Sequence, residues 1–123
     1  MTNRDKALLV SAARAVGTHT SQAYSADGHK GIRLFLDVTV RGSTGTVDTK
    51  IQIQDVVAKQ WQDLPGAALV AIAAVGRKCL TVAPGIGETA NESVSDVLTG
   101  PFRVVAVVAG ETTTFSVSAC LFP

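Results

Sequence analysis

The residues that could do chemistry in this chain are few and widely spaced. Its two histidines are His19 and His29, and Asp27 lies shortly before the second. A zinc site needs three or four converging ligands, whereas Asp27-Gly28-His29 is also an ordinary turn sequence. The sequence therefore predicts no metal site.

Glu88, Glu92 and Asp96 form the densest group of carboxylates. Paired carboxylates can hydrolyse glycosides when they face each other across a cleft in which aromatic rings hold the sugar. The nearest aromatic residue along the chain is Phe102, so a solvated loop fits this group better. No nucleophile elbow for Ser-His-Asp catalysis is present. The sequence predicts a protein without enzymatic activity.

Two glycine-bearing segments, Gly85-Ile86-Gly87 and Gly42-Ser43-Thr44-Gly45-Thr46, could suggest phosphate binding. The first lacks the third glycine and the strand-loop-helix context, and the second lacks the Lys-Ser/Thr ending. Both segments predict turns, and no cofactor is expected.

Trp61 is the only tryptophan and lies between Gln60 and Gln62. An indole with polar neighbours can stack on a sugar or anchor a protein contact. It can also close one end of a core, and aromatic residues make up only 5% of the chain, too few for a platform of several rings. A core position is favoured, and a small carbohydrate-binding module stays open as an alternative function.

The chain has 123 residues, which predicts a single domain. Its net charge of +1 provides no strong field for nucleic acid or an anionic membrane. The start is too polar for a signal peptide, and the longest apolar run, 67–75, is too short to span a bilayer. We expect a soluble protein made in a reducing cytosol, with Cys79 and Cys120 as two buried thiols rather than a disulfide.

Alternating residues predict two hairpins. In 32–54, Ile32, Leu34, Leu36, Val38 and Val40 should face the core on the first strand, and Val47, Thr49, Ile51 and Ile53 on the second. A glycine-bearing connection at 42–46 joins these strands. The last hairpin is 102–122, with Phe115, Val117, Ala119 and Leu121 facing the core.

The remaining segments are assigned more coarsely. Residues 1–6 should form a flexible arm before a single domain over 7–123. In that domain we favour a strand over 7–16, whose Ala and Leu content also suits a helix. We expect a short edge strand around 21–25 and a strand over 59–63 that a turn at 64–66 closes. A doubly buried strand or short helix should follow over 67–75, then a strand over 79–83 and a long loop over 84–101 with a helical turn near 93–98. The expected fold is all-β, an antiparallel, jelly-roll-like β-sandwich of about eight strands with one long loop.

Several motifs occur together in a fixed order. Ser11-Ala-Ala-Arg14 is followed by Lys30-Gly-Ile-Arg-Leu-Phe-Leu-Asp-Val-Thr39 and Lys50-Ile-Gln-Ile-Gln-Asp55; then Pro84-Gly-Ile-Gly-Glu-Thr-Ala-Asn91 leads to Pro101-Phe-Arg-Val104. In this order and spacing, over about residues 8–110, the chain resembles a group of small virion proteins of tailed bacteriophages. Those proteins often have tryptophan where this chain has Phe102.

The resemblance implies a capsid decoration (cement) protein with a β-sandwich fold. Such a protein binds the outer surface of the head shell and stabilises contacts between capsid subunits, so the implied partners are the major capsid protein and copies of this chain. The implied location is the virion exterior, after synthesis in the host bacterial cytoplasm; a neck, tail or head-fibre position is the alternative. Candidate contact residues lie in the arm, at the tryptophan and in the long loop: Asn3, Arg4, Lys6, Trp61, Glu88, Asn91 and Glu92.

Overall fold

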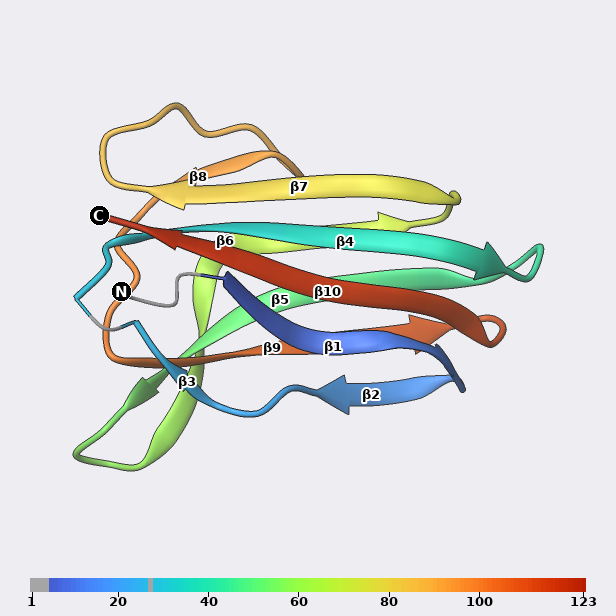
Figure 1. Cartoon of the computed structure of the whole chain (residues 1–123), viewed down its shortest axis with the longest axis horizontal. Coiled ribbons are helices and arrows are strands. Elements are labelled where there is room, and N and C mark those ends of the chain that lie inside the picture. The colour runs from blue at the N-terminus through green and yellow to red at the C-terminus, as the bar shows by residue number, and fades with distance from the viewer. Residues whose placement is uncertain (1–4, 27) are drawn as a thin grey trace.

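The computed structural model describes residues 5–26 and 28–123, and strands are the only regular elements in this part of the chain (Figure 1). They are β1 (Asp5–Arg14), β2 (Gly17–Thr20), β3 (Tyr24–Ser25), β4 (Gly31–Arg41), β5 (Thr46–Asp55), β6 (Gln60–Ile72), β7 (Gly76–Ala83), β8 (Ser93–Ser95), β9 (Pro101–Ala109) and β10 (Thr113–Phe122). Across the described residues, no helix is long and apolar enough to cross a membrane.

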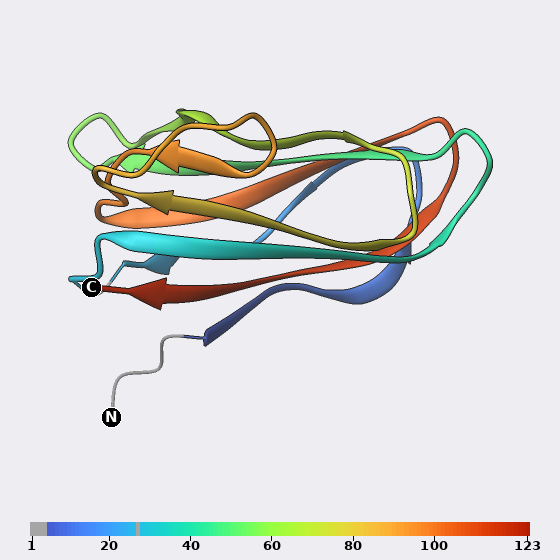
Figure 2. The ribbon, with the colours of Figure 1, turned by 90° about the horizontal axis from the view of Figure 1, so that it is seen from above.

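The strands form two sheets that face each other (Figure 2). The first sheet has the order β1-β10-β4-β7-β8, and the second has β2-β9-β5-β6, with β3 paired to the end of β9. Without the short β3 and β8, each sheet has four antiparallel strands, and the chain crosses repeatedly between the sheets. This order is that of a jelly roll, so the predicted fold class is confirmed.

The core lies between the sheets and follows the predicted alternation. In β4, Ile32, Leu34 and Leu36 are fully buried, and the inward residues of β5, β9 and β10 meet them from both sheets. Phe102, at the position where tryptophan was expected, is also fully buried.

Val40 departs from the predicted alternation, because its side chain is 61% exposed. Val38 pairs with Phe115 and Val40 with Thr114, so Thr39 is an extra residue in β4. Such a β-bulge shifts the alternation by one residue and turns Val40 away from the core.

The turn predicted at 64–66 is wrong, because β6 runs through it. The pairing shifts between Lys50–Ala68 and Gln52–Asp63, so β6 accommodates Leu64-Pro65-Gly66 as a bulge. Pro65 is tolerated there because β6 is an edge strand and the residue sits in a bulge, while Gly66 adopts a positive φ of 75°. The segment 67–75 is strand as far as Ile72, but only one face of it is buried.

Three further boundaries differ from expectation. The helical turn near 93–98 is wrong, because Ser93–Ser95 form β8, which pairs in parallel with β7. Of the short edge strand expected around 21–25, only Tyr24–Ser25 is strand (β3), and a further strand that was not predicted, β2, precedes it at Gly17–Thr20. The strand predicted over 7–16 is present as β1, but it runs from Asp5 to Arg14 and so includes Asp5 and Lys6 of the segment predicted as an arm; residues 1–4 lie outside the described part.

Candidate docking surfaces

Arg14 bridges β1 and β10 where their pairing is bulged. Its guanidinium donates hydrogen bonds to the carbonyl oxygens of Val10 (2.5 Å), Ala12 (3.2 Å) and Phe115 (2.6 Å). It also lies 4.7 Å from the centroid of the Phe115 ring, within cation-π range, and partial burial lowers the pKa of Arg14. The arginine of the Ser11-Ala-Ala-Arg14 motif therefore holds the bulged end of β1 in place.

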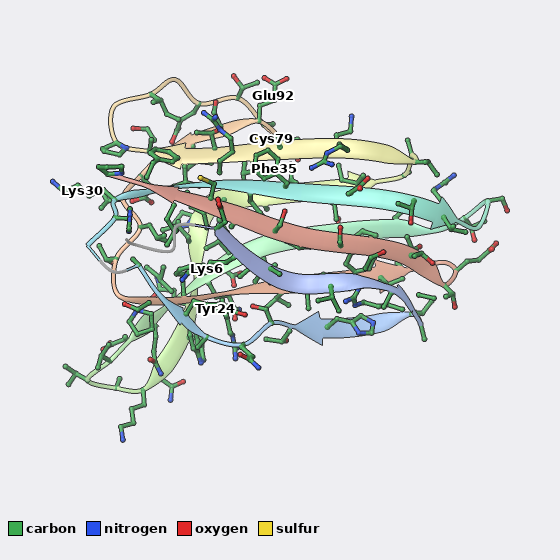
Figure 3. All side chains as sticks on the ribbon, viewed as in Figure 1. Lys6, Tyr24, Lys30, Phe35, Cys79 and Glu92 are labelled. Atoms are coloured by element: carbon green, nitrogen blue, oxygen red, sulfur yellow. The ribbon has the colours of Figure 1, made fainter. Side chains whose placement is uncertain are left out.

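The beginning of β1 is tied to the second sheet. The Tyr24 hydroxyl donates to the carbonyl of Ala7 at 3.3 Å, and the Lys6 ammonium lies 5.8 Å from the centroid of the Tyr24 ring. Figure 3 shows Lys6 and Tyr24 together at this edge. Lys6, a predicted contact residue, is half-buried, and its side chain packs against Tyr24 within the same chain. The predicted contacts Asn3 and Arg4 lie outside the described residues.

Asn91 protects the edge of β6. It adopts a left-handed backbone conformation (φ 62°), which asparagine tolerates better than most residues. Its side-chain amide accepts from the Val70 N–H at 2.9 Å and donates to the Val70 carbonyl at 3.4 Å. The next N–H, that of Ala71, donates to the Asp48 carboxylate. Asn91 thus takes the place of a neighbouring strand at Val70, while Asp48 of β5 fills the bulge in the β5–β6 pairing.

The loop that carries Glu88 and Glu92 is internally hydrogen-bonded. Thr89 and Ser93 form a bridge, the Ser93 hydroxyl donates to the Gly87 carbonyl at 2.8 Å, and the Ser95 N–H donates to Glu88 Oε1 at 3.3 Å. The Glu92 carbonyl accepts from Thr81 of β7 at 2.9 Å. The loop is therefore a preformed surface.

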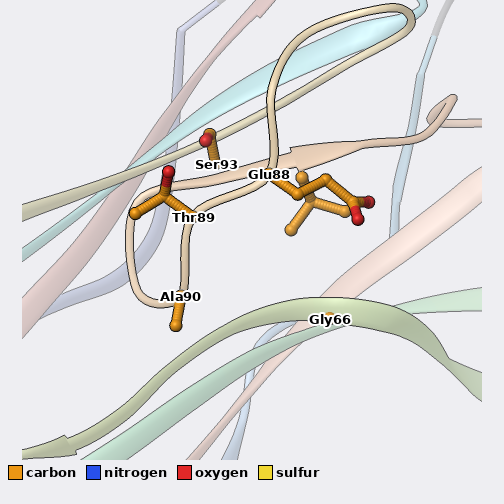
Figure 4. A pocket seen from close by; sticks show the side chains of 6 residues that line it. Gly66, Glu88, Thr89, Ala90 and Ser93 are labelled. Atoms are coloured by element: carbon orange, nitrogen blue, oxygen red, sulfur yellow. The ribbon is translucent and has the colours of Figure 1, made fainter.

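An open hollow of about 180 Å³ lies between this loop and β6, lined by Glu88, Thr89, Ala90, Ser93, Val94 and Gly66. In Figure 4, Ala90 projects toward the strand that contains Gly66. Within the described part of the chain, no three His, Cys, Asp or Glu side chains converge as metal ligands do.

Trp61 belongs to a polar network on the outer face of the second sheet. The Arg103 guanidinium lies 4.4 Å from the centroid of the indole, and its Nε donates to Gln52 Oε1 at 2.8 Å. Gln52 and Lys50 both donate to Asp63, at 2.9 Å and 3.0 Å. These two hydrogen bonds lower the pKa of Asp63.

Trp61 itself is half-buried, so it neither closes the core nor stands free beside a second ring. The aromatic pair found among the described residues is Tyr24 with Phe102, at 6.3 Å, and does not include Trp61. Because Arg103 stacks on the indole, the geometry does not favour a carbohydrate platform.

An apolar turn stands beside Trp61 at the junction of β5 and β6. Val57 is 96% exposed and Val56 60% exposed. One carboxylate oxygen of Asp55 accepts the N–H groups of Val57 and Ala58, both at 3.1 Å. The turn therefore presents two valines in a fixed conformation.

The outer face of the first sheet carries Phe35 and both cysteines. Phe35 and Cys79 are cross-strand partners on β4 and β7 and lie side by side in Figure 3. Cys79 is exposed and Cys120 half-buried, so the prediction of two buried thiols is wrong. Both point outward, and β4 separates their strands, so they lie about 10 Å or more apart, too far for a disulfide.

The structure therefore disperses the predicted contact residues. Glu88, Asn91 and Glu92 share the loop beside β6 and β7, Trp61 lies on the second sheet, and Lys6 lies on the β1 edge. Sequence reasoning missed Arg103, Phe35 and the Val56–Val57 turn. Phe35 did carry a signal, since a large aromatic side chain on the polar face of an alternating strand is unusual.

No family model matches the chain, and no curated protein matches it in sequence. Among solved structures, it is similar to a chain of the infectious bursal disease virus Gt strain, with 12% identity and a TM-score of 0.47 over 97% of this chain and 33% of that one. A chain of the VP2 subviral particle of the same virus gives 13% identity and a TM-score of 0.46 over 97% and 32%.

A chain of the Cowpea Mosaic Virus empty virus-like particle gives 17% identity and a TM-score of 0.39 over 89% of this chain and 55% of that one. The present chain spans about a third of the length of the bursal disease virus chains. All these TM-scores lie below 0.5, so the jelly-roll assignment rests on the strand order alone.

Proposed function

We propose that this chain is a virion structural protein of a tailed bacteriophage, of the capsid decoration (cement) type. It binds the outer surface of the head shell and adds binding energy across the seams between capsid subunits, without catalysis. Its partners are the major capsid protein and further copies of itself. A neck, tail or head-fibre position is the alternative within the same class.

The observation that carries this proposal is how the motif residues of the resemblance are used. Arg14 of the first motif secures the β1 edge, and Asn91 of the loop motif covers the β6 edge. Both serve a stiff sandwich with protected edges and preformed surfaces, which is what a protein that works by contact requires. Preformed surfaces lose little conformational entropy on binding.

The Val56–Val57 turn is the surface we assign to shell binding. Its two valines are exposed in a conformation that Asp55 fixes. Trp61, which pairs with Gln54 just before the turn, carries Arg103 against its indole, and both residue types are enriched at binding hot spots. Many copies in a symmetric array add such modest contacts into a large stabilisation.

Two experiments test these assignments. Mass spectrometry of purified virions should give a copy number comparable to that of the major capsid protein. A handful of copies would indicate a neck or tail position, and absence would refute the virion role.

The second experiment tests the turn. Val57→Asp should lower the occupancy of the protein on shells without changing its melting temperature. Val75→Asp is the matched control, because Val75 is 62% exposed but lies in the β6–β7 connection. Equal occupancy for both variants would refute the assignment of the turn.

A further inference from the structure

The outward-facing stripe of β4 has a distinctive order: Arg33, Phe35, Asp37. These residues alternate with Leu34 and Leu36, both fully buried, so they face away from the core. A cation, an aromatic ring and an anion thus follow one another at intervals of two residues, about 7 Å apart along the strand.

The neighbours of Phe35 on this face are small. The register places Ala7 of β1, Ser118 of β10, Phe35 and Cys79 of β7 in one row across the sheet. On one side of this row lie Cys120, Arg33 and Thr81, and on the other Ser116, Asp37 and Arg77. A hollow of about 520 Å³ opens between Phe35 and the start of β1, lined by the small residues Ala7, Ser118, Ala119 and Cys120 and by the charged residues Asp5, Lys6 and Arg77. An aromatic side chain whose neighbours in its own row are small is suited to act as an anchor in a contact.

We propose that this face binds the same face of a second copy about a two-fold axis that runs along the row of Phe35. This proposal adds a specific self-contact to the structural role proposed above. The interface itself is argued from the geometry, and only its use in a virion rests on the proposed function. A two-fold about this row places β4 against the partner's β4 in the opposite direction. Arg33 then faces the partner's Asp37, Asp37 faces the partner's Arg33, and the two Phe35 rings meet at the axis.

Charge complementarity favours a second copy as the occupant. An interface with two-fold symmetry must be self-complementary, and equal spacing of opposite charges on either side of Phe35 meets this condition. Asp37 has one ion-pair partner within its own chain, Arg77, at 3.9 Å, the outer limit of such contacts. The Arg33 side chain has one long hydrogen bond, from Nε to Thr81 Oγ1 at 3.3 Å, and lies 6.0 Å from the centroid of the Phe122 ring. Neither contact supplies an anion, so both charges can accept a partner across the interface.

The area of the face also fits. Four strands at about 4.8 Å spacing and seven or eight residues at about 3.4 Å rise cover about 500 Å² per copy. The pair of copies would bury about 1,000 Å², the lower limit for a specific interface. We therefore expect a dimer with a dissociation constant in the micromolar range in solution. Assembly through the edge of β6 is disfavoured at Val70, since Asn91 occupies both of its backbone groups.

Exchanging the charges of Arg33 and Asp37 tests their predicted pairing across the two-fold axis. Self-association of the isolated full chain is measured by sedimentation equilibrium and native mass spectrometry. Arg33→Asp alone or Asp37→Arg alone places like charges opposite each other twice in the dimer, and each should weaken self-association about tenfold or more. An equimolar mixture of the two variants should recover association as a heterodimer, which native mass spectrometry identifies by its mass. Arg41→Asp, a charge change at the end of β4, is the matched control and should leave dimerisation unchanged.

Cysteine cross-linking tests the position of the axis. Cys79 lies in the row of the axis and would face its own counterpart, whereas Cys120 would face the row of Ser116. A bis-maleimide that spans the roughly 10 Å between packed sheets should therefore link two copies of the Cys120→Ser variant, but not two copies of Cys79→Ser.

A monomeric wild-type chain at several hundred micromolar concentration would overturn the proposal. So would a dimer that both charge variants leave intact, or efficient cross-linking through Cys120 alone. Because these measurements need no virion, they are independent of the mass-spectrometric test of the decoration role. A dimer that responds as expected, from a protein absent from virions, would uphold this interface while the proposed function failed.

Discussion

Replacement of Arg14 by methionine should destabilise the fold far more than its position near the end of an edge strand suggests. Methionine keeps an unbranched apolar stem over Phe115 but removes every donor of the guanidinium. Three carbonyl oxygens, those of Val10, Ala12 and Phe115, then lose a partner. The first two bonds are exposed, so water can replace them, whereas the Phe115 carbonyl is partly buried.

The expected loss follows from these differences. A hydrogen bond from a charged donor contributes about 1.5–3 kcal/mol net, and only the bond to Phe115 should approach that value. The cation-π contact at 4.7 Å adds about 0.5–1 kcal/mol. The sum is about 2–4 kcal/mol, which corresponds to a fall in melting temperature on the order of 10 °C for a domain of this size. Arg14→Lys keeps the charge but reaches fewer carbonyls, so it should recover less than half of the loss.

Urea unfolding, followed by Trp61 fluorescence, measures these differences as shifts of the midpoint at constant slope. Arg77→Met is the matched control: its side chain is 68% exposed and its ion pair with Asp37 spans 3.9 Å, so it should change stability by less than about 0.5 kcal/mol. If Arg14→Met behaves like Arg77→Met, or if Arg14→Lys matches the wild type, the account of Arg14 as the clamp of β1 is refuted.

Four further predictions concern the core, one buried hydroxyl, pH and the N-terminus. Leu36→Ala should cost about 2–5 kcal/mol in urea unfolding, because Leu36 is fully buried; a loss below 1 kcal/mol would contradict its inward position. Thr49→Val should be neutral or stabilise by about 1 kcal/mol, since the buried Thr49 hydroxyl has no hydrogen-bond partner among the described residues, and a clear loss would reveal a missed partner. The pKa of Asp63 is lowered in the fold by Gln52 and Lys50, so its contribution is present above the unfolded pKa and lost as pH falls through the folded pKa. Between pH 7 and 2, the unfolding midpoint of Asp63→Asn should therefore fall less steeply at the acid end than that of the wild type. Identical profiles for the two proteins would show that Asp63 does not contribute to the loss of stability in acid. Deletion of residues 1–4, which leaves β1 intact, should lower occupancy on shells while the melting temperature stays unchanged; full occupancy would exclude this segment from shell binding.

Strict alternation made the two hairpins predictable. The residues of β4 up to Val38 and those of β10 face the core as expected, because burial of one face enforces the register of a strand. Alternation did not anticipate the bulges, since the shift at Thr39 and the insertion at Leu64-Pro65-Gly66 depend on how the partner strand pairs. A Pro-Gly pair ends most strands, but at the edge of a sheet it can be absorbed as a bulge.

The candidate contact residues were harder to predict, because long-range pairing decides which of them meet. Asn91 and Val70 are far apart in the sequence, as are Arg103 and Trp61. Their contacts nevertheless determine how the loop lies against β6 and what surrounds the indole. The cysteines illustrate the same point. Thiols are commonly buried, yet Cys79 and Cys120 occupy the outward positions of their strands, where cross-strand partners rather than residue type determine exposure.

The distribution of these contacts also bears on how the protein can assemble. A jelly roll has free edges that could recruit strands from any neighbour. Here side chains from other segments bind backbone groups of two edge strands: Tyr24 donates to the Ala7 carbonyl of β1, and Asn91 bonds both backbone groups of Val70 on β6. Strand addition at these positions would first have to break those hydrogen bonds. On the outer face around Phe35, the contacts of Asp37 with Arg77 (3.9 Å) and of Arg33 with Thr81 (3.3 Å) are long, so association there, as at the exposed Val56–Val57 turn, costs little. Contacts through faces and turns, rather than edges, allow many identical copies to bind a shell side by side without polymerising with one another.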